Sequence, residues 1–207
     1  MKHLHLGFLA SHGGSNMQAI IDACKDGTLA ATPSVVISNN ADSLALERAK
    51  KEGLPTFHFS SKTHPNTEVL DAIILQTLQK YNVDLLILAG YMRMLGKQTL
   101  KQYKNRILNI HPALLPKFGG KGMYGQFVHE AVIAAKEKKS GVTIHLVDDR
   151  YDHGAIVAQT EVAVLENDTP QSLSERVLAE EHKIFAITLQ RISKGEIDLD
   201  QIAAAKK

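Results

Sequence analysis

A carboxamide and an imidazole stand two residues apart in the segment Asn109-Ile110-His111-Pro112. The apolar pair Ile107-Leu108 before them is typical of the end of a buried strand, so both side chains leave the same side of that strand. Together they can donate hydrogen bonds to an oxygen that gains negative charge during a reaction. The segment therefore predicts a catalytic site, although an Asn and a His that satisfy loop backbone groups would show the same spacing.

Three carboxylates follow a later apolar run, in the segment Asp148-Asp149-Arg150-Tyr151-Asp152-His153-Gly154. A carboxylate beside an imidazole orients the ring and favours its charged form. Spacing alone does not say which aspartate would reach His111, and Asp and Gly are also typical of a hairpin turn. A metal is the other alternative, but no pair of ligands occurs at metal-site spacing on one element, so no metal is expected.

A glycine-rich loop, Ser11-His12-Gly13-Gly14-Ser15-Asn16, follows the first apolar run and precedes a helical pattern. The free N–H groups of a helix N-terminus bind anions, glycine lets the backbone approach the ligand, and Ser15 is a suitable N-cap. The pattern matches neither the dinucleotide nor the ATP loop. A simple glycine turn is the alternative, but the position at the first strand end of an α/β sheet favours a phosphate site.

Two further segments carry side chains that could contact a ligand. Gly90-Tyr91-Met92-Arg93-Met94-Leu95 follows the most apolar strand and could line a pocket for a flat ring, or simply cover the sheet with Arg93 reaching water. Glu181 falls on the apolar stripe of the last helix. Its carboxylate must reach either solvent or a buried partner, and a sugar hydroxyl or an ammonium group would be a functional partner.

These residues must be positioned by an alternation of strands and helices. Strand patterns occur at residues 4–10, 32–38, 56–59, 84–89 and 107–111, with helical patterns between them. This order predicts an α/β fold with a doubly wound, mostly parallel sheet and helices on both faces. Beyond a helix expected at residues 124–139, strands at 141–147 and 156–164 predict one antiparallel strand near the C-terminal edge. A long helix is expected from Pro170 to Gly195.

Length and composition limit the class of protein. We expect one domain over residues 1–207, because this length suits one large domain. A net charge of +2 spread along the chain gives no basic patch for nucleic acid or a membrane surface. One cysteine excludes an internal disulfide framework. No apolar run is long enough for a membrane span and no signal peptide is evident, so a cytoplasmic protein is predicted.

Four segments together resemble the phosphoribosylglycinamide formyltransferases. They are Gly14-Ser15-Asn16, Leu88-Ala89-Gly90-Tyr91-Met92-Arg93-Met94-Leu95, Leu108-Asn109-Ile110-His111-Pro112-Ala113-Leu114-Leu115-Pro116 and Gly141-Val142-Thr143-Ile144-His145-Leu146-Val147-Asp148-Asp149. The resemblance covers nearly the whole chain and implies the formyltransferase fold. It also implies transfer of the formyl group of 10-formyltetrahydrofolate, a co-substrate, to the amine of glycinamide ribonucleotide in purine biosynthesis.

The resemblance further implies a role for each group of candidate residues. The catalytic residues would be Asn109, His111 and Asp149. The ribonucleotide, on the N-terminal half, would be held by Gly14, Ser15, Asn16 and Glu181. The folate, on the C-terminal half, would be bound by Met92, Arg93, Met94, Leu95, Asn109 and Asp149. The expected partners are these two small molecules, with no nucleic acid and no membrane, and the oligomeric state is left open.

Two other functions fit the same pattern in part. A non-catalytic nucleotide- or folate-binding module would keep the glycine loop but would not need Asn109, His111 and Asp149 together. A deformylase would use water in place of the amine. The chain also departs from the family pattern at His12, at the long glycine-rich segment Phe118–Gly125 and at Leu178, which affects the expected details of ribonucleotide binding.

Overall fold

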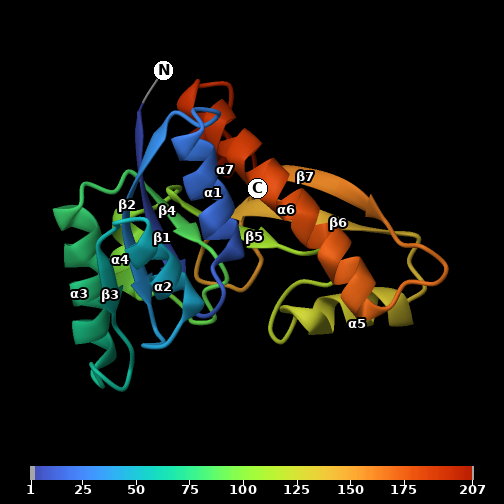
Figure 1. The fold of residues 1–207 in the computed structure, drawn as a ribbon, viewed down its shortest axis with the longest axis horizontal. Coiled ribbons are helices and arrows are strands. Elements are labelled where there is room, and N and C mark those ends of the chain that lie inside the picture. Colours follow the sequence, from blue (N-terminus) through green and yellow to red (C-terminus); the bar gives the residue numbers. More distant parts are fainter. Residues whose placement is uncertain (1–2, 207) are drawn as a thin grey trace.

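The computed structural model describes residues 3–206 and builds them around a seven-stranded sheet (Figure 1). Its strands are β1 (Leu4–Ala10), β2 (Ala31–Ser38), β3 (Thr56–His58), β4 (Leu85–Leu88), β5 (Ile107–His111), β6 (Lys139–Leu146) and β7 (Ile156–Ala163). Its helices are α1 (Ser15–Lys25), α2 (Leu44–Lys51), α3 (Thr67–Lys80), α4 (Lys97–Gln102), α5 (Gln126–Ala134), α6 (Pro170–Ser193) and α7 (Leu199–Ala205).

The strand order is β3-β2-β1-β4-β5-β6-β7. The first five strands pair in parallel, whereas β6 runs antiparallel to both β5 and β7. This arrangement confirms the predicted doubly wound sheet with one antiparallel strand near the C-terminal edge. The change of direction at β6 matters for the site, because the antiparallel register sets His145 opposite Asn109 and Thr143 opposite His111.

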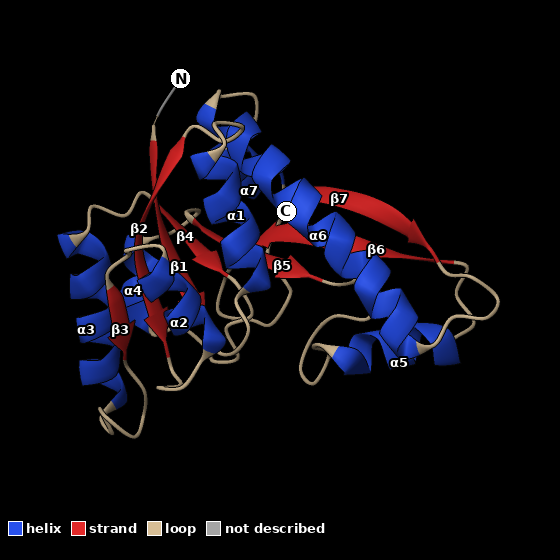
Figure 2. Cartoon of the chain, viewed as in Figure 1, coloured by secondary structure: helices blue, strands red, loops and turns tan. Residues whose placement is uncertain are grey.

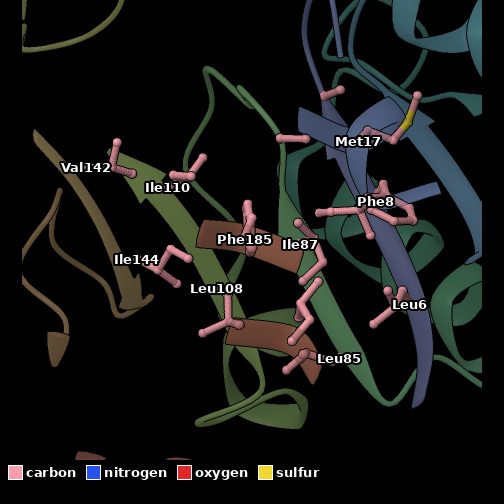
Figure 3. Packing of buried hydrophobic residues seen from close by; sticks show 14 of the residues in the cluster. Leu6, Phe8, Met17, Leu85, Ile87, Leu108, Ile110, Val142, Ile144 and Phe185 are labelled. Atoms are coloured by element: carbon pink, nitrogen blue, oxygen red, sulfur yellow. The ribbon is translucent and has the colours of Figure 1, made fainter. Parts of the chain in front are cut away.

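The two faces of the sheet bury different sets of helices (Figure 2). Side chains alternate along β1, so Leu6 and Phe8 enter the cluster that contains α1, α2 and α6, whereas Leu9 enters the one that contains α3. Figure 3 shows Phe185 of α6 lying over the strand residues Ile87 and Leu108. Helices α1 and α6 lie side by side on this first face (Figure 1), and their contact brings the start of α1 to the middle of α6.

Three local predictions differ from the structure. The helix expected at residues 124–139 ends at Ala134, because Lys136 has a positive φ of 52° and β6 begins at Lys139. Helix α7, capped by the Asp198 side chain, was not predicted. Ser15 is the first residue of α1 and not its N-cap, because Gly14 takes that position in a left-handed conformation.

None of the helices within residues 3–206 is both long and apolar enough to cross a membrane.

Candidate active site

Strands β5 and β6 present a polar face opposite the hydrophobic core. Asn109 pairs with His145 in the antiparallel register and His111 pairs with Thr143, so all four side chains leave the same face of the sheet. The alternate residues of these strands, Leu108, Ile110, Val142 and Ile144, belong to the core under α6. Two loops, 112–125 and 147–155, contact the polar face and complete the site.

The ring of His111 is buried, with 3% of its surface exposed, and its two nitrogens have different partners. Nε2 lies 2.7 Å from the Phe118 carbonyl oxygen, which can only accept, so Nε2 carries a proton. Nδ1 faces Oδ2 of Asp152 at 3.6 Å. Burial lowers the pKa of His111, and the Asp152 carboxylate partly opposes that shift. Nδ1 is therefore the nitrogen free to exchange a proton.

Asp152 is the carboxylate that reaches the imidazoles. Its Oδ1 lies 3.5 Å from Nε2 of His145, and its Oδ2 accepts a hydrogen bond of 2.9 Å from the Gly120 amide. Burial opposes its ionisation, but the imidazoles of His145 and His111, when protonated, and the Gly120 amide together hold the pKa of Asp152 below its usual value.

The structure places Asp152 beside His111, in the position that was expected for Asp149. The loop turns at Asp148, whose Oδ1 accepts from the Arg150 amide at 2.8 Å, and this turn leaves Asp149 exposed. Farther along, Asp152 adopts a left-handed φ of 51°. Gly154 then passes so close to β6 that an added Cβ would lie 1.5 Å from the Leu146 carbonyl oxygen. This path carries Asp152 inward over the polar face.

His145 orients the amide of Asn109. Nδ1 of His145 lies 2.8 Å from the Leu146 carbonyl oxygen and donates to it. In the neutral ring Nε2 is then an acceptor, and it accepts from Nδ2 of Asn109 at 3.0 Å. One N–H of the Asn109 amide is therefore fixed, and the other is available to a ligand.

Thr143 holds the loop that follows β5. Its hydroxyl donates to the Ala113 carbonyl at 2.6 Å and accepts from the Leu115 amide at 3.0 Å and from Gln159 at 2.8 Å. These bonds fix the chain directly after His111. Because the loop reaches Phe118, they also fix the carbonyl that orients the His111 ring.

The glycine loop before α1 is held against α2. Gly14 has a φ of 66°, and an added Cβ would lie 2.7 Å from the Cβ of Ala45, so the position requires glycine. The Arg48 side chain donates to the Gly13 carbonyl at 3.0 Å. The helical bonding pattern starts with the Gln18 amide, so the amides of residues 15–17 precede it at the helix N-terminus, where anions bind.

Asn16 and Glu181 form a buried pair between α1 and α6. Nδ2 of Asn16 donates to Oε2 of Glu181 at 2.7 Å, and the Glu181 side chain is 7% exposed. Burial raises the pKa of Glu181 to about 7, although the bond from Asn16 lowers it. Oδ1 of Asn16 is buried without a hydrogen-bond partner among the described residues, which leaves a polar atom for a ligand to satisfy.

The loop after β4 is fastened to the loop after β1. The Met92 amide donates to the buried Ser11 hydroxyl at 2.7 Å. The side chains of Met92 and Met94 are 41% and 45% exposed, and Arg93 is also exposed. Residues 93–95 line a cavity of about 880 Å³ together with the loops after β1, β2 and β3, whereas His111 does not line it.

Sequence reasoning missed several residues that contact this site. His145 and Thr143 could have been found from the two-residue period of β6. Arg48 gave no such signal, because its bond to the Gly13 carbonyl joins two segments that meet only in the folded protein. Nδ1 of the buried His129 has no hydrogen-bond partner within residues 3–206, and burial and the charge of His111 lower the pKa of this ring.

Comparisons with known proteins show the family to which this chain belongs. The family model described as formyl transferase matches residues 4–189. The phosphoribosylglycinamide formyltransferase of Escherichia coli is 33% identical over 97% of this chain and 92% of its own. The crystal structure of glycinamide ribonucleotide transformylase 1 from Symbiobacterium toebii is 39% identical and has a TM-score of 0.87, covering 93% of this chain and 89% of that chain.

A plant relative is longer than this chain. The chloroplastic phosphoribosylglycinamide formyltransferase of Arabidopsis thaliana is 40% identical over 93% of this chain, which spans only 66% of that protein.

Proposed function

Because the chain belongs to the formyl transferase family, among the phosphoribosylglycinamide formyltransferases, we propose that it transfers a formyl group to the amine of glycinamide ribonucleotide. The donor is 10-formyltetrahydrofolate, which acts as co-substrate. The reaction makes formylglycinamide ribonucleotide and tetrahydrofolate for purine biosynthesis. One observation carries the proposal: Asn109, His111, His145 and Asp152 form a connected polar network on one sheet face.

The network suits attack by an amine on a formyl carbon. As the new C–N bond forms, the formyl oxygen becomes an oxyanion. The free N–H of Asn109 donates to that oxygen, and its direction is set by His145 through the other N–H. A donor fixed in advance needs no reorganisation during the reaction, so its contribution goes to the transition state.

His111 moves the proton. The attacking amine becomes positively charged, and Nδ1 of His111 takes one proton from it, which makes the ring an imidazolium. Asp152, at 3.6 Å from Nδ1, stabilises that cation. The tetrahedral intermediate then collapses, the bond from the formyl carbon to N10 of the folate breaks, and the imidazolium returns the proton to N10. Asp152 takes the role that the sequence assigned to Asp149.

The ribonucleotide spans the sheet from the glycine loop to β5. Its phosphate binds the N–H groups of Gly14, Ser15 and Asn16, and Glu181 accepts hydrogen bonds from its sugar hydroxyls. Strands β1 and β5 are separated by β4 alone, so their ends lie about 10 Å apart, and this spacing supports a phosphate at the end of β1 with the amine at the end of β5.

The folate lies between two loops. Met92, Arg93, Met94 and Leu95 contact its ring on one side, and the loop with Asp149 and Asp152 closes it on the other, beside Asn109. Holding both substrates in attack geometry supplies much of the rate. The single domain over residues 1–207 and the cytoplasmic location stay predictions.

Incubation with 10-formyltetrahydrofolate, with and without glycinamide ribonucleotide, tests the proposal. We expect tetrahydrofolate to appear only when the ribonucleotide is present, in equal amount with its formylated product. Release of formate without the ribonucleotide would indicate a deformylase. Binding of both ligands without turnover would indicate a non-catalytic module.

A further inference from the structure

A row of three side chains crosses β5, β6 and β7 on the polar face of the sheet, and its outermost member has no role in the mechanism described above. His111 pairs with Thr143 in the register of β5 and β6, and Thr143 pairs with Gln159 in the register of β6 and β7. Residues that pair directly place their side chains on the same face of a sheet. Thr143 is fully buried, whereas Gln159 is exposed on β7, the edge strand. The row therefore extends from the protein surface to the His111 ring.

Gln159 completes a set of four hydrogen bonds around the Thr143 hydroxyl. Nε2 of Gln159 has two hydrogens, and it donates to the Leu115 carbonyl at 3.0 Å and to the Thr143 hydroxyl at 2.8 Å. The same hydroxyl accepts from the Leu115 amide at 3.0 Å and donates to the Ala113 carbonyl at 2.6 Å. A hydroxyl has one hydrogen and two lone pairs, so its bonding capacity is filled. We call these four bonds the Gln159 clasp, which holds both backbone groups of Leu115.

The position of Leu115 affects both groups that contact the His111 ring. The carbonyl bonded to Nε2 of His111 lies three residues after Leu115. Gly119 follows that carbonyl, and it passes so close to the Leu115 side chain that an added Cβ would overlap it. The same added Cβ would lie 3.3 Å from Cβ of Asp152, and the next amide along the chain donates to Oδ2 of Asp152 at 2.9 Å. A displacement of Leu115 therefore reaches both the carbonyl and the carboxylate beside the ring.

We propose that Gln159 is a positioning residue for formyl transfer, which holds the two partners of the His111 ring in place through Thr143 and Leu115. The proposal rests on the proposed function, in which His111 carries the proton. Gln159 touches neither the reacting atoms nor the substrates in that mechanism. Because its side chain is exposed and fills no space in the core, the fold does not depend on it. Its two bonds instead fix a geometry in which an error of about 1 Å can cost about 10²-fold in rate.

The protonation of His111 reports whether the Gln159 clasp is intact. Burial lowers the pKa of His111, and the Asp152 carboxylate and the loop carbonyl bonded to Nε2 oppose that shift. The other titratable groups that face the ring are the imidazoles of His145 on β6 and His129 on α5. Within residues 3–206, Gln159 bonds none of these groups, so its loss changes the pKa of His111 only by moving the loop. Looser contacts with the carboxylate and the carbonyl lower that pKa further.

Gln159→Met tests the proposal, because it keeps a neutral, unbranched side chain and removes both N–H groups. Titration of the His111 ring by nuclear magnetic resonance needs no turnover, and the signals are assigned by their absence in His111→Ala. We expect the ring to titrate at lower pH in Gln159→Met than in the parent. In the enzyme assay kcat should fall by up to about 10²-fold, with its acidic limb displaced to lower pH, because the ring must be neutral to accept the proton. KM for the ribonucleotide should not change, because the glycine loop follows β1.

Gln171→Met is the matched control. It makes the same change on another exposed glutamine, at the start of α6, where Nε2 of Gln171 donates to Glu175 at 2.7 Å. This variant should keep the parent titration of His111 and the parent kcat. Gln159→Leu removes the same two N–H groups as Gln159→Met, and it decides the question if the methionine variant fails to fold.

Two results would overturn the proposal. One is a His111 titration in Gln159→Met that matches the parent, whatever happens to kcat, because a merely structural loss lowers kcat without that shift. The other is an equal shift in Gln171→Met, which would show that the effect does not depend on the clasp. A shift confined to Gln159→Met supports the clasp even if the protein transfers no formyl group. Turnover by the parent with no shift in Gln159→Met rejects the clasp and leaves the proposed function intact.

Discussion

Oδ2 of Asp152 lies 3.6 Å from Nδ1 of His111, although the two residues come from different loops over the same sheet face. The opposite nitrogen of the ring is occupied by the Phe118 carbonyl. A proton added to His111 therefore enters the space in front of the carboxylate. The protonation of the His111 ring therefore depends on the position of Asp152 in the 147–155 loop.

Asp152→Asn should lower kcat by about 10²-fold or more, because it removes the charge that stabilises the imidazolium. It should also move the acidic limb of the kcat–pH profile to lower pH. The carboxylate raises the pKa of His111, so its loss lowers that pKa, and the ring must be neutral to accept the proton. Asp149→Asn changes the same charge in the same loop. It should keep the parent kcat and pH limb, with any loss confined to KM for folate. A shift of equal size in both variants would contradict the assignment.

Asn109→Ala and His111→Ala should each lower kcat by roughly 10²–10³, the usual cost of removing an oxyanion donor or a proton-transfer group. Ribonucleotide binding should change little, because the glycine loop follows β1 and is separate from these residues.

The double variant His111→Ala/Asp152→Asn should have a kcat only slightly below that of the slower single variant, because the effects of residues acting as a unit are not additive. Steady-state kinetics with both substrates saturating measures these effects. Parent-like turnover in His111→Ala would eliminate the mechanism.

Glu181→Gln should make the stability of the protein less dependent on pH. The pKa of Glu181 rises from 4.5 to about 7 on folding, so its favourable contribution is full below pH 4.5 and is lost as the pH rises through 7. At pH 8 the variant should be more stable than the parent by up to about 3 kcal/mol, and near pH 4 the two should converge. Urea unfolding at several pH values measures the difference. A gap that is constant with pH would mean that the carboxyl is not protonated in the fold.

Ser11→Ala should raise KM for folate with little effect on kcat. The variant leaves the Met92 amide and the Asn39 carboxamide without their buried partner, at a cost of about 1–3 kcal/mol that falls on the loop lining the folate site. Ser61→Ala is a suitable control, because Ser61 lines the same cavity but is exposed. An unchanged KM in Ser11→Ala would show that the loop is held by other contacts.

The sequence predicted the sheet well because apolar runs and periodicity are local signals. Asn109 and His111 were placed on one face by the two-residue period of a strand, and the structure has them there. The helix predicted after Tyr124 extends beyond the observed end at Ala134, because the composition of residues 131–138 favours a helix. The chain instead leaves the helix at Lys136 and pairs β6 with both neighbours, a tertiary gain that overrides local propensity.

The partner of His111 could not be found by local reasoning. Asp149 and Asp152 have the same side chain and lie three residues apart in one turn. Asp152 reaches His111 and Asp149 does not, because Asp152 has a left-handed backbone and Gly154 passes close to Leu146. The Asn16–Glu181 pair is similar, because it joins residues 165 positions apart that meet only after α1 and α6 have packed.

The antiparallel course of β6 also leaves two loops free to close over the polar face of the sheet. Asn109 and His111 lie on β5, whereas the Phe118 carbonyl and the Asp152 carboxylate that contact His111 come from two loops. Loop 112–125 joins β5 to α5, and loop 147–155 joins β6 to β7. Neither loop supplies a strand to the sheet. Because loops tolerate changes in length and sequence, the surroundings of the acceptor can vary while the strand that carries Asn109 and His111 stays the same.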